Sequence, residues 1–248
     1  IIEYDGTRYS GFQYQVNAPS VQAELEMAVQ RLTGERVRIA AAGRTDSGVH
    51  AVGQVVALDT SSGLPVQRFV SGMNFYLPRD VAVRSSQTVV ESFDPRRDAL
   101  SRRYRYVLLN RVGRSPLSDR TAAVVKVPLN LEPMIAASKL MVGTHDFLRF
   151  AGPVPRPDAS TVRNISEITM ESDGERIEID VEGNAFLPHQ VRRMVGALVD
   201  VGLGKMTTQQ VSGLLNGDEK ERHARSMPPQ GLCLVAVRYP EHLAVNFQ

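Results

Sequence analysis

The order of strand-like and helix-like segments constrains the fold most, because the same order occurs twice along the chain. In the first half, strand patterns surround two helix patterns at about 20–34 and 66–76, with Ser20 as the expected N-cap and Gly34 as the expected end of the first. The second half adds strand patterns at 104–109, 123–127, 162–171, 177–183 and 232–239, and helix patterns at 131–142, 190–201 and 209–215. The first half follows the order β-α-β-β-α-β, and the second half repeats it with additions, which predicts an α+β fold of two ferredoxin-like halves with mainly antiparallel sheets.

The boundary between the two halves is predicted near Arg102. It gives an N-terminal half of residues 1–101 and a C-terminal half of residues 102–248. Two similar halves imply a cleft where their sheets meet, and clefts between domains are favoured binding sites. We therefore expect the substrate site in this cleft, with residues from both halves.

Residues 43–51, with the sequence Gly-Arg-Thr-Asp-Ser-Gly-Val-His-Ala, lie between two strand patterns. Two interpretations of this loop are open from the residues alone. In the first, the loop only makes turns, because Asp and Ser side chains bond nearby backbone N–H groups and Gly accepts positive φ. In the second, Arg44 keeps Asp46 charged, and an enclosed pocket holds a carboxylate that acts as nucleophile or base.

Arginine dominates the basic residues of the chain. Of 29 lysines and arginines only four are lysines, although the net charge of +2 by itself argues weakly for a nucleic-acid partner. The densest basic segment covers residues 93–106, where basic residues are interleaved with aromatic ones. Cations for phosphates and rings for bases suit single-stranded RNA, while a solvated linker that runs into an amphipathic strand has the same pattern.

The composition argues against a metal centre and against a membrane span. The single cysteine, Cys233, excludes an internal disulfide framework, and the five histidines are scattered without ligand spacing. No apolar run approaches the roughly 20 residues that a transmembrane helix needs. We therefore expect a protein without metal, located in the cytoplasm.

The nine residues 43–51 resemble the signature of the tRNA pseudouridine synthase A family, whose members isomerise uridines at positions 38 to 40 in the tRNA anticodon arm. Shorter family-like stretches occur in order along nearly the whole chain, at 4–6, 11–13, 20–22, 143–147, 163–165 and 184–196. The resemblance implies an enzyme without a cofactor, a tRNA partner, and a homodimer in which one tRNA contacts both subunits.

The resemblance also implies the residues of the site. Asp46 matches the catalytic Asp of the family, Arg44 matches the Arg of the same motif, and Arg192 matches the Arg that forms an ion pair with that Asp. Tyr104 matches the tyrosine that packs against the target base and helps to move the proton. The expected RNA contacts are Arg96, Arg97, Arg103 and Arg105. The family match places Arg96 close to the pocket.

Three alternatives remain open at this point. A non-catalytic RNA-binding protein would also use ferredoxin-like units, but Asp46 on its RNA side would repel phosphate. A hydrolase of N-glycosidic bonds would normally need a second carboxylate, and the chain has no paired acidic motif. A pseudouridine synthase could also act on another RNA. Pro188 and Cys233 depart from the family pattern and are expected to alter the walls of the pocket.

Overall fold

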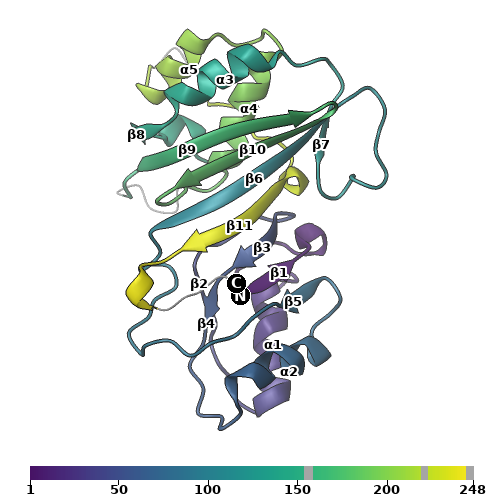
Figure 1. The fold of residues 1–248 in the computed structure, drawn as a ribbon, viewed down its shortest axis with the longest axis vertical. Helices are drawn as coiled ribbons and strands as arrows, with labels where there is room; N and C mark the ends of the chain where they lie inside the picture. The colour runs from purple at the N-terminus through teal and green to yellow at the C-terminus, as the bar shows by residue number, and fades with distance from the viewer. Residues whose placement is uncertain (154–158, 219–222, 244–248) are drawn as a thin grey trace. The chain divides into compact units, whose positions relative to one another are not determined.

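A computed structural model describes residues 1–153, 159–218 and 223–243, which belong to two compact units (Figure 1). Unit 1 contains residues 1–102 together with the end of the chain from Cys233 onward, and unit 2 contains residues 103–232. The boundary predicted near Arg102 lies next to this division. The closing strand, which the prediction assigns to the C-terminal half, is grouped with unit 1 in the structure.

The sheet strands of unit 1 follow the order β5-β1-β3-β11. Strand β1 (Ile2–Tyr4) pairs antiparallel with both β3 (His50–Gln54) and β5 (Val81–Val83). Strand β11 (Leu232–Arg238) pairs parallel with β3. This pairing of strands that are far apart in sequence explains why the end of the chain belongs to unit 1.

The strands on either side of residues 43–51 are shorter than the sequence predicts. Two of them, β2 (Ala40–Ala41) and β4 (Val56–Ala57), form a separate antiparallel ribbon. The backbone changes partner at Val55, whose carbonyl accepts from the N–H of Ala42 at 2.9 Å. Because β3 already begins at His50, the loop itself covers residues 42–49.

The two helices of unit 1 are confirmed, and they lie side by side (Figure 1). Helix α1 (Val21–Thr33) begins where the Ser20 side chain accepts from the Ala23 N–H, and it ends at Gly34 with φ of +80°. Its apolar face is buried, which is the ordinary arrangement of an amphipathic helix. Helix α2 (Val66–Tyr76) buries Phe69 and Met73.

The sheet strands of unit 2 follow the order β6-β10-β9-β8, and β7 pairs parallel with β6. Their bounds are β6 (Ser101–Asn110), β7 (Ala123–Val125), β8 (Gly143–Asp146), β9 (Val162–Asp173) and β10 (Arg176–Gly183). Strands β9 and β10 form an antiparallel hairpin, and β8 pairs antiparallel with β9. Strand β8 was not predicted, because its sequence Gly-Thr-His-Asp lacks apolar alternation.

Helices α3 (Leu131–Leu140), α4 (Gln190–Gly202) and α5 (Thr208–Leu215) gather on one side of this sheet (Figure 1). On β10, Ile177, Ile179 and Val181 are buried, while the intervening side chains are charged. The described residues thus form a mixed α/β fold with five α-helices and mainly antiparallel strand pairs. Among them, every helix is too short or too polar to cross a lipid bilayer.

Candidate active site

Asp46 lies in the loop between β2 and β3 of unit 1, as the sequence predicts for a loop residue. Its side chain is half-buried, the preceding Thr45 is buried, and Arg44 is exposed. Water screens the charge of an exposed arginine, which weakens its effect on a neighbouring carboxylate. The predicted influence of Arg44 on Asp46 therefore stays a prediction.

Residues from the start of the chain hold this loop through hydrogen bonds to Thr45. The hydroxyls of Tyr4 and Thr45 lie 2.7 Å apart, and the Phe12 N–H donates to the Thr45 carbonyl at 3.1 Å. Both Tyr4 and Phe12 are buried, so these bonds are shielded from water. Thr45, the residue next to Asp46, is thus held both by its side chain and by its backbone carbonyl.

Gly11 allows the closest approach between the two segments. It has φ of +103°, and a Cβ at this position would lie 2.8 Å from the Thr45 carbonyl oxygen. The Ser47 hydroxyl and the Gly48 N–H both donate to the Tyr9 carbonyl, at 3.1 Å and 3.3 Å. A side chain at residue 11 would clash and would adopt a strained backbone conformation.

The residues that support the loop were not selected as site residues from the sequence. Their signal was present, because the stretches 4–6 and 11–13 are among the family-like segments. Local patterns do not show that residues 33 to 41 positions apart, such as Phe12 and Thr45 or Tyr4 and Thr45, bond to each other. The structure supplies this contact.

In unit 2, the side chains of β6 alternate between two faces. Tyr104 and Tyr106 are buried, and the intervening Arg103 and Arg105 are half-buried on the other face. The ring of Tyr104 contacts that of Phe186 edge-on, with centroids 5.2 Å apart and an interplanar angle of 84°. The tyrosine and the two arginines therefore face different environments.

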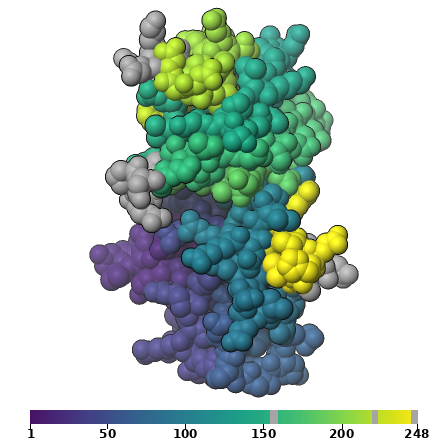
Figure 2. Space-filling model, turned by 90° about the vertical axis from the view of Figure 1, so that its left-hand side faces the viewer, coloured from purple at the N-terminus to yellow at the C-terminus, as the bar shows by residue number. Residues whose placement is uncertain are grey.

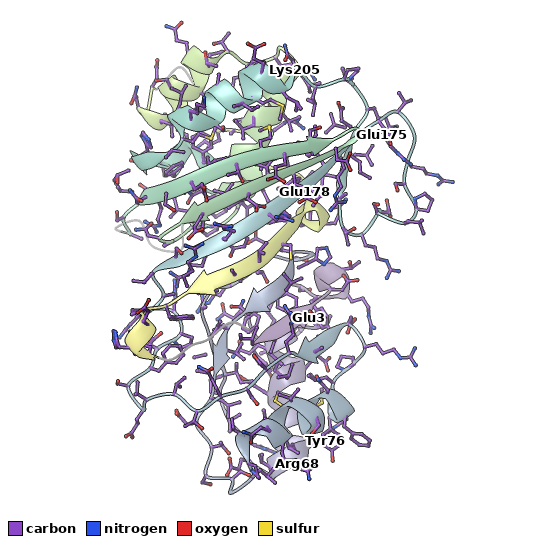
Figure 3. The ribbon with its side chains drawn as sticks, in the orientation of Figure 1. Glu3, Arg68, Tyr76, Glu175, Glu178 and Lys205 are labelled. Carbon is purple, nitrogen blue, oxygen red and sulfur yellow. The ribbon has the colours of Figure 1, made fainter. Side chains whose placement is uncertain are left out.

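Arg103 and Arg105 form ion pairs with carboxylates of β9 and β10. Arg103 contacts Glu182 at 2.7 Å and Glu167 at 3.3 Å. Arg105 contacts Asp180 at 2.7 Å and Glu178, labelled in Figure 3, at 2.6 Å. The hydrogen bond to Asp180 raises the pKa of Arg105 further. These carboxylates already balance the positive charges of Arg103 and Arg105, which were predicted to bind RNA phosphates.

Arg96 and Arg97 lie instead on a turn of unit 1 and are exposed. Asp94 Oδ1 accepts from the backbone N–H groups of both arginines, at 2.8 Å and 3.0 Å. The bond from the Arg97 N–H is the largest cause that lowers the pKa of Asp94. The Arg97 side chain reaches Asp94 only at 3.6 Å and is 87% exposed.

The C-terminal segment of unit 1 packs against this turn. The hydroxyl of Tyr239 donates to the Pro95 carbonyl at 2.6 Å, and its ring lies 5.2 Å from that of Phe93. Figure 2 shows residues of the yellow segment lying against the blue surface of the same unit. The turn that carries Arg96 and Arg97 is therefore supported by packing.

Arg192 lies in the first turn of α4 and is half-buried. Its Nε donates to the Met227 carbonyl at 2.8 Å, and the Met227 N–H donates to the Arg192 carbonyl at 3.1 Å. Arg192 is therefore held more firmly than a solvated helix-surface charge. Pro188 precedes α4 by two residues, and Cys233 lies in β11 opposite His50.

The predicted site residues are divided between the two units. Arg44, Asp46, Arg96 and Arg97 belong to unit 1, and Arg103, Tyr104, Arg105 and Arg192 belong to unit 2. The meeting of both sets in one pocket stays a prediction. Within the described ranges, no three His, Cys, Asp or Glu side chains are grouped so that they could hold a metal ion.

The fold and the loop can be compared with known proteins. A family model described as tRNA pseudouridine synthase matches residues 1–96 and 137–240. The chain belongs to this family, which is a family of isomerases. The family predicted from residues 43–51 is confirmed.

Curated relatives cover nearly the whole chain. tRNA pseudouridine synthase A of Myxococcus xanthus is 44% identical over 96% of this chain and 90% of its own length. The proteins of the same name from Geotalea uraniireducens and Geobacter sp. strain M21 are both 42% identical, over 96% and 97% of this chain and 98% of their own length. The similarity therefore includes both units.

Proposed function

We propose that this protein isomerises uridine to pseudouridine at positions 38, 39 and 40 of the tRNA anticodon stem-loop, with Asp46 as the catalytic carboxylate. The observation that carries the proposal is the family's nine-residue signature at residues 43–51, whose loop is held by buried contacts to Thr45. Rigid support of this kind is what a catalytic carboxylate needs.

The reaction is balanced without a cofactor. The N1–C1′ glycosidic bond breaks, the freed uracil rotates, and C5 bonds to C1′ while the proton at C5 is transferred to N1. No atom is gained or lost, and no redox change occurs. A carboxylate assists by attacking the base or the ribose, or by taking a proton from the sugar, and Asp46 suits each of these routes.

Tyr104 and Arg192 complete the site in this proposal. A base must leave its stack before an enzyme can act on it, and an aromatic ring such as that of Tyr104 supports the extruded base. Arg192 pairs with the Asp46 carboxylate through its planar guanidinium group. The two units are then the two ferredoxin-like halves, and their cleft holds the target uridine.

The partner of the protein in this proposal is tRNA, bound by a homodimer in which one tRNA contacts both subunits. Arg96 and Arg97 are exposed, as phosphate contacts must be. A tRNA substrate also implies a cytoplasmic location. Light scattering of the protein with and without tRNA measures the assembly, and a mass of one chain without tRNA and of one chain plus one tRNA with it would contradict the dimer.

The experiment that tests the function is incubation with an unmodified tRNA transcript, followed by mapping of pseudouridine along it. We expect pseudouridine at one or more of positions 38 to 40, and none in a matched transcript with cytidine at these three positions. Pseudouridine elsewhere, or only in another RNA, would contradict the assigned target. Released uracil would indicate a glycosidic hydrolase, and RNA binding with unchanged nucleosides would indicate a non-catalytic protein.

A further inference from the structure

We infer that Arg102 is a positioning residue that ties the turn carrying Arg96 and Arg97 to the start of the Asp46 loop. The inference rests on the proposed function, because it gives Arg102 a part in that reaction. Arg102 is not among the residues that the family signature selects. Its side chain is buried, with 7% of the residue exposed.

The guanidinium of Arg102 bonds to the backbone on both sides. It donates to the Ala42 carbonyl through Nη2 at 2.9 Å and Nε at 3.3 Å. It also donates to the Ala99 carbonyl through Nη1 at 3.1 Å, and to the Arg96 carbonyl through Nη2. One side chain thus connects the turn of residues 94–99 with the residue that precedes the signature.

Both ends of this connection are rigid. Ala42 is buried, its N–H donates to the Val55 carbonyl at 2.9 Å, and the next carbonyl, that of Gly43, accepts from Gln54 Nε2 at 2.8 Å. At the other end, the Asp94 carboxylate holds the backbone of Arg96 and Arg97. A tRNA phosphate bound to the turn is therefore held at a fixed place relative to Asp46.

Only arginine can make this connection. Its planar fork carries five N–H donors that point in different directions, whereas a lysine ammonium is a single point of charge. We expect Arg102→Lys to keep a positive charge and to lose the simultaneous contacts to Ala42 and Ala99. The Asp46 loop would then move with respect to the bound tRNA.

The first test compares turnover with binding. For Arg102→Ala we expect kcat to fall on the order of 10²-fold, because a shift of about 1 Å costs this much, while Kd for tRNA changes less than about threefold. Millimolar guanidinium should restore at least part of kcat, and potassium chloride at equal ionic strength should not. Unchanged kcat, or equal losses in kcat and affinity, would overturn the positioning role.

The matched control is Arg111, which also donates to two backbone carbonyls, those of Gly113 and Arg114, but far along the sequence from the signature. Arg111→Ala should leave kcat unchanged, with and without guanidinium. If Arg102→Ala does not fold, Arg102→Lys and Arg111→Lys replace the two variants. Equal kcat in these lysine variants would also overturn the inference.

Amide hydrogen exchange separates this inference from the proposed function. Arg102→Lys should speed exchange in residues 42–49 and 94–99, and Arg111→Lys should not. If the wild-type protein makes no pseudouridine, the proposed function is wrong, and so is the role of Arg102 in turnover. The exchange rates would still test whether Arg102 connects the turn to the Asp46 loop. If the wild type is active but both variants exchange at equal rates, the connection made by Arg102 would be refuted and the proposed function would stand.

Discussion

The Asp46 loop and the arginine-rich segment of residues 94–105 are both predicted to act on RNA, yet they are held in different ways. The loop is fixed by buried hydrogen bonds between uncharged groups, such as that between Tyr4 and Thr45. The arginine-rich segment is fixed by charges and carbonyls nearer the surface, such as those around Asp94 and Asp180. A group that performs chemistry needs a fixed position, and a group that holds phosphate needs access to solvent.

The arginines of this segment fall into two groups. Arg96 and Arg97 are exposed on their turn, whereas Arg103 and Arg105 pair with carboxylates of the neighbouring strands. An arginine that is already paired releases fewer counterions when it meets a phosphate, because its charge is largely neutralised. From residue type alone all four arginines are predicted to contact phosphate. The carboxylates next to Arg103 and Arg105 distinguish these two from Arg96 and Arg97.

The largest effect is expected at Asp46. Asp46→Asn keeps the shape of the side chain and removes its charge and nucleophilicity, so kcat should fall on the order of 10³-fold or more. Kd for tRNA and the melting temperature should change little. The measurement is pseudouridine formation under single-turnover conditions, and substantial residual turnover would remove Asp46 from the catalytic role.

Gly11→Ala tests whether buried support of the loop matters. The strain and the clash with the Thr45 carbonyl should lower the free energy of unfolding by about 2 kcal/mol and should also reduce kcat. Gly34→Ala is the matched control, because Gly34 has φ of +80° and no atom within 4 Å of the added Cβ. Urea unfolding and kcat of both variants check this. Equal kcat in the two would mean that the contact at Thr45 has no part in turnover.

Arg97→Ala tests the exposed turn. If Arg97 holds a phosphate, its loss should weaken binding to all tRNAs about equally and reduce the slope of log affinity against log salt by about 0.7–0.9. Filter binding at several salt concentrations measures the slope. An unchanged slope would mean that the turn does not carry the RNA path. Arg96→Ala should in addition lower turnover, since the family resemblance places this residue close to the pocket.

Arg105→Ala should give the smallest effect. Its side chain is 41% exposed and shares its charge with Asp180 and Glu178, so its removal should cost only about 0.2–1 kcal/mol of unfolding free energy. The salt slope of tRNA binding should stay unchanged. A reduction as large as that of Arg97→Ala would show that β6 also holds phosphate, and the division of the arginines would then fail.

The sequence by itself determined the local features of this protein. Helical spacing after Ser20 and before Gly34 gave α1 with its caps, because both the spacing and the caps act within a few residues. The nine residues 43–51 gave the family, since a signature of this length is specific. The strand pattern of residues 104–109 predicted β6, but it did not predict which residues each face of the strand would contact.

Only the tertiary structure decided the contacts between distant segments. It paired β11 with β3 and so joined the end of the chain to unit 1. It also placed Tyr4 and Phe12 against Thr45, paired Arg105 with Asp180, and brought Arg102 to the Ala42 carbonyl. Local periodicity specifies which side chains are buried, but the partner of a buried or charged group depends on which edges and faces the folded chain brings together.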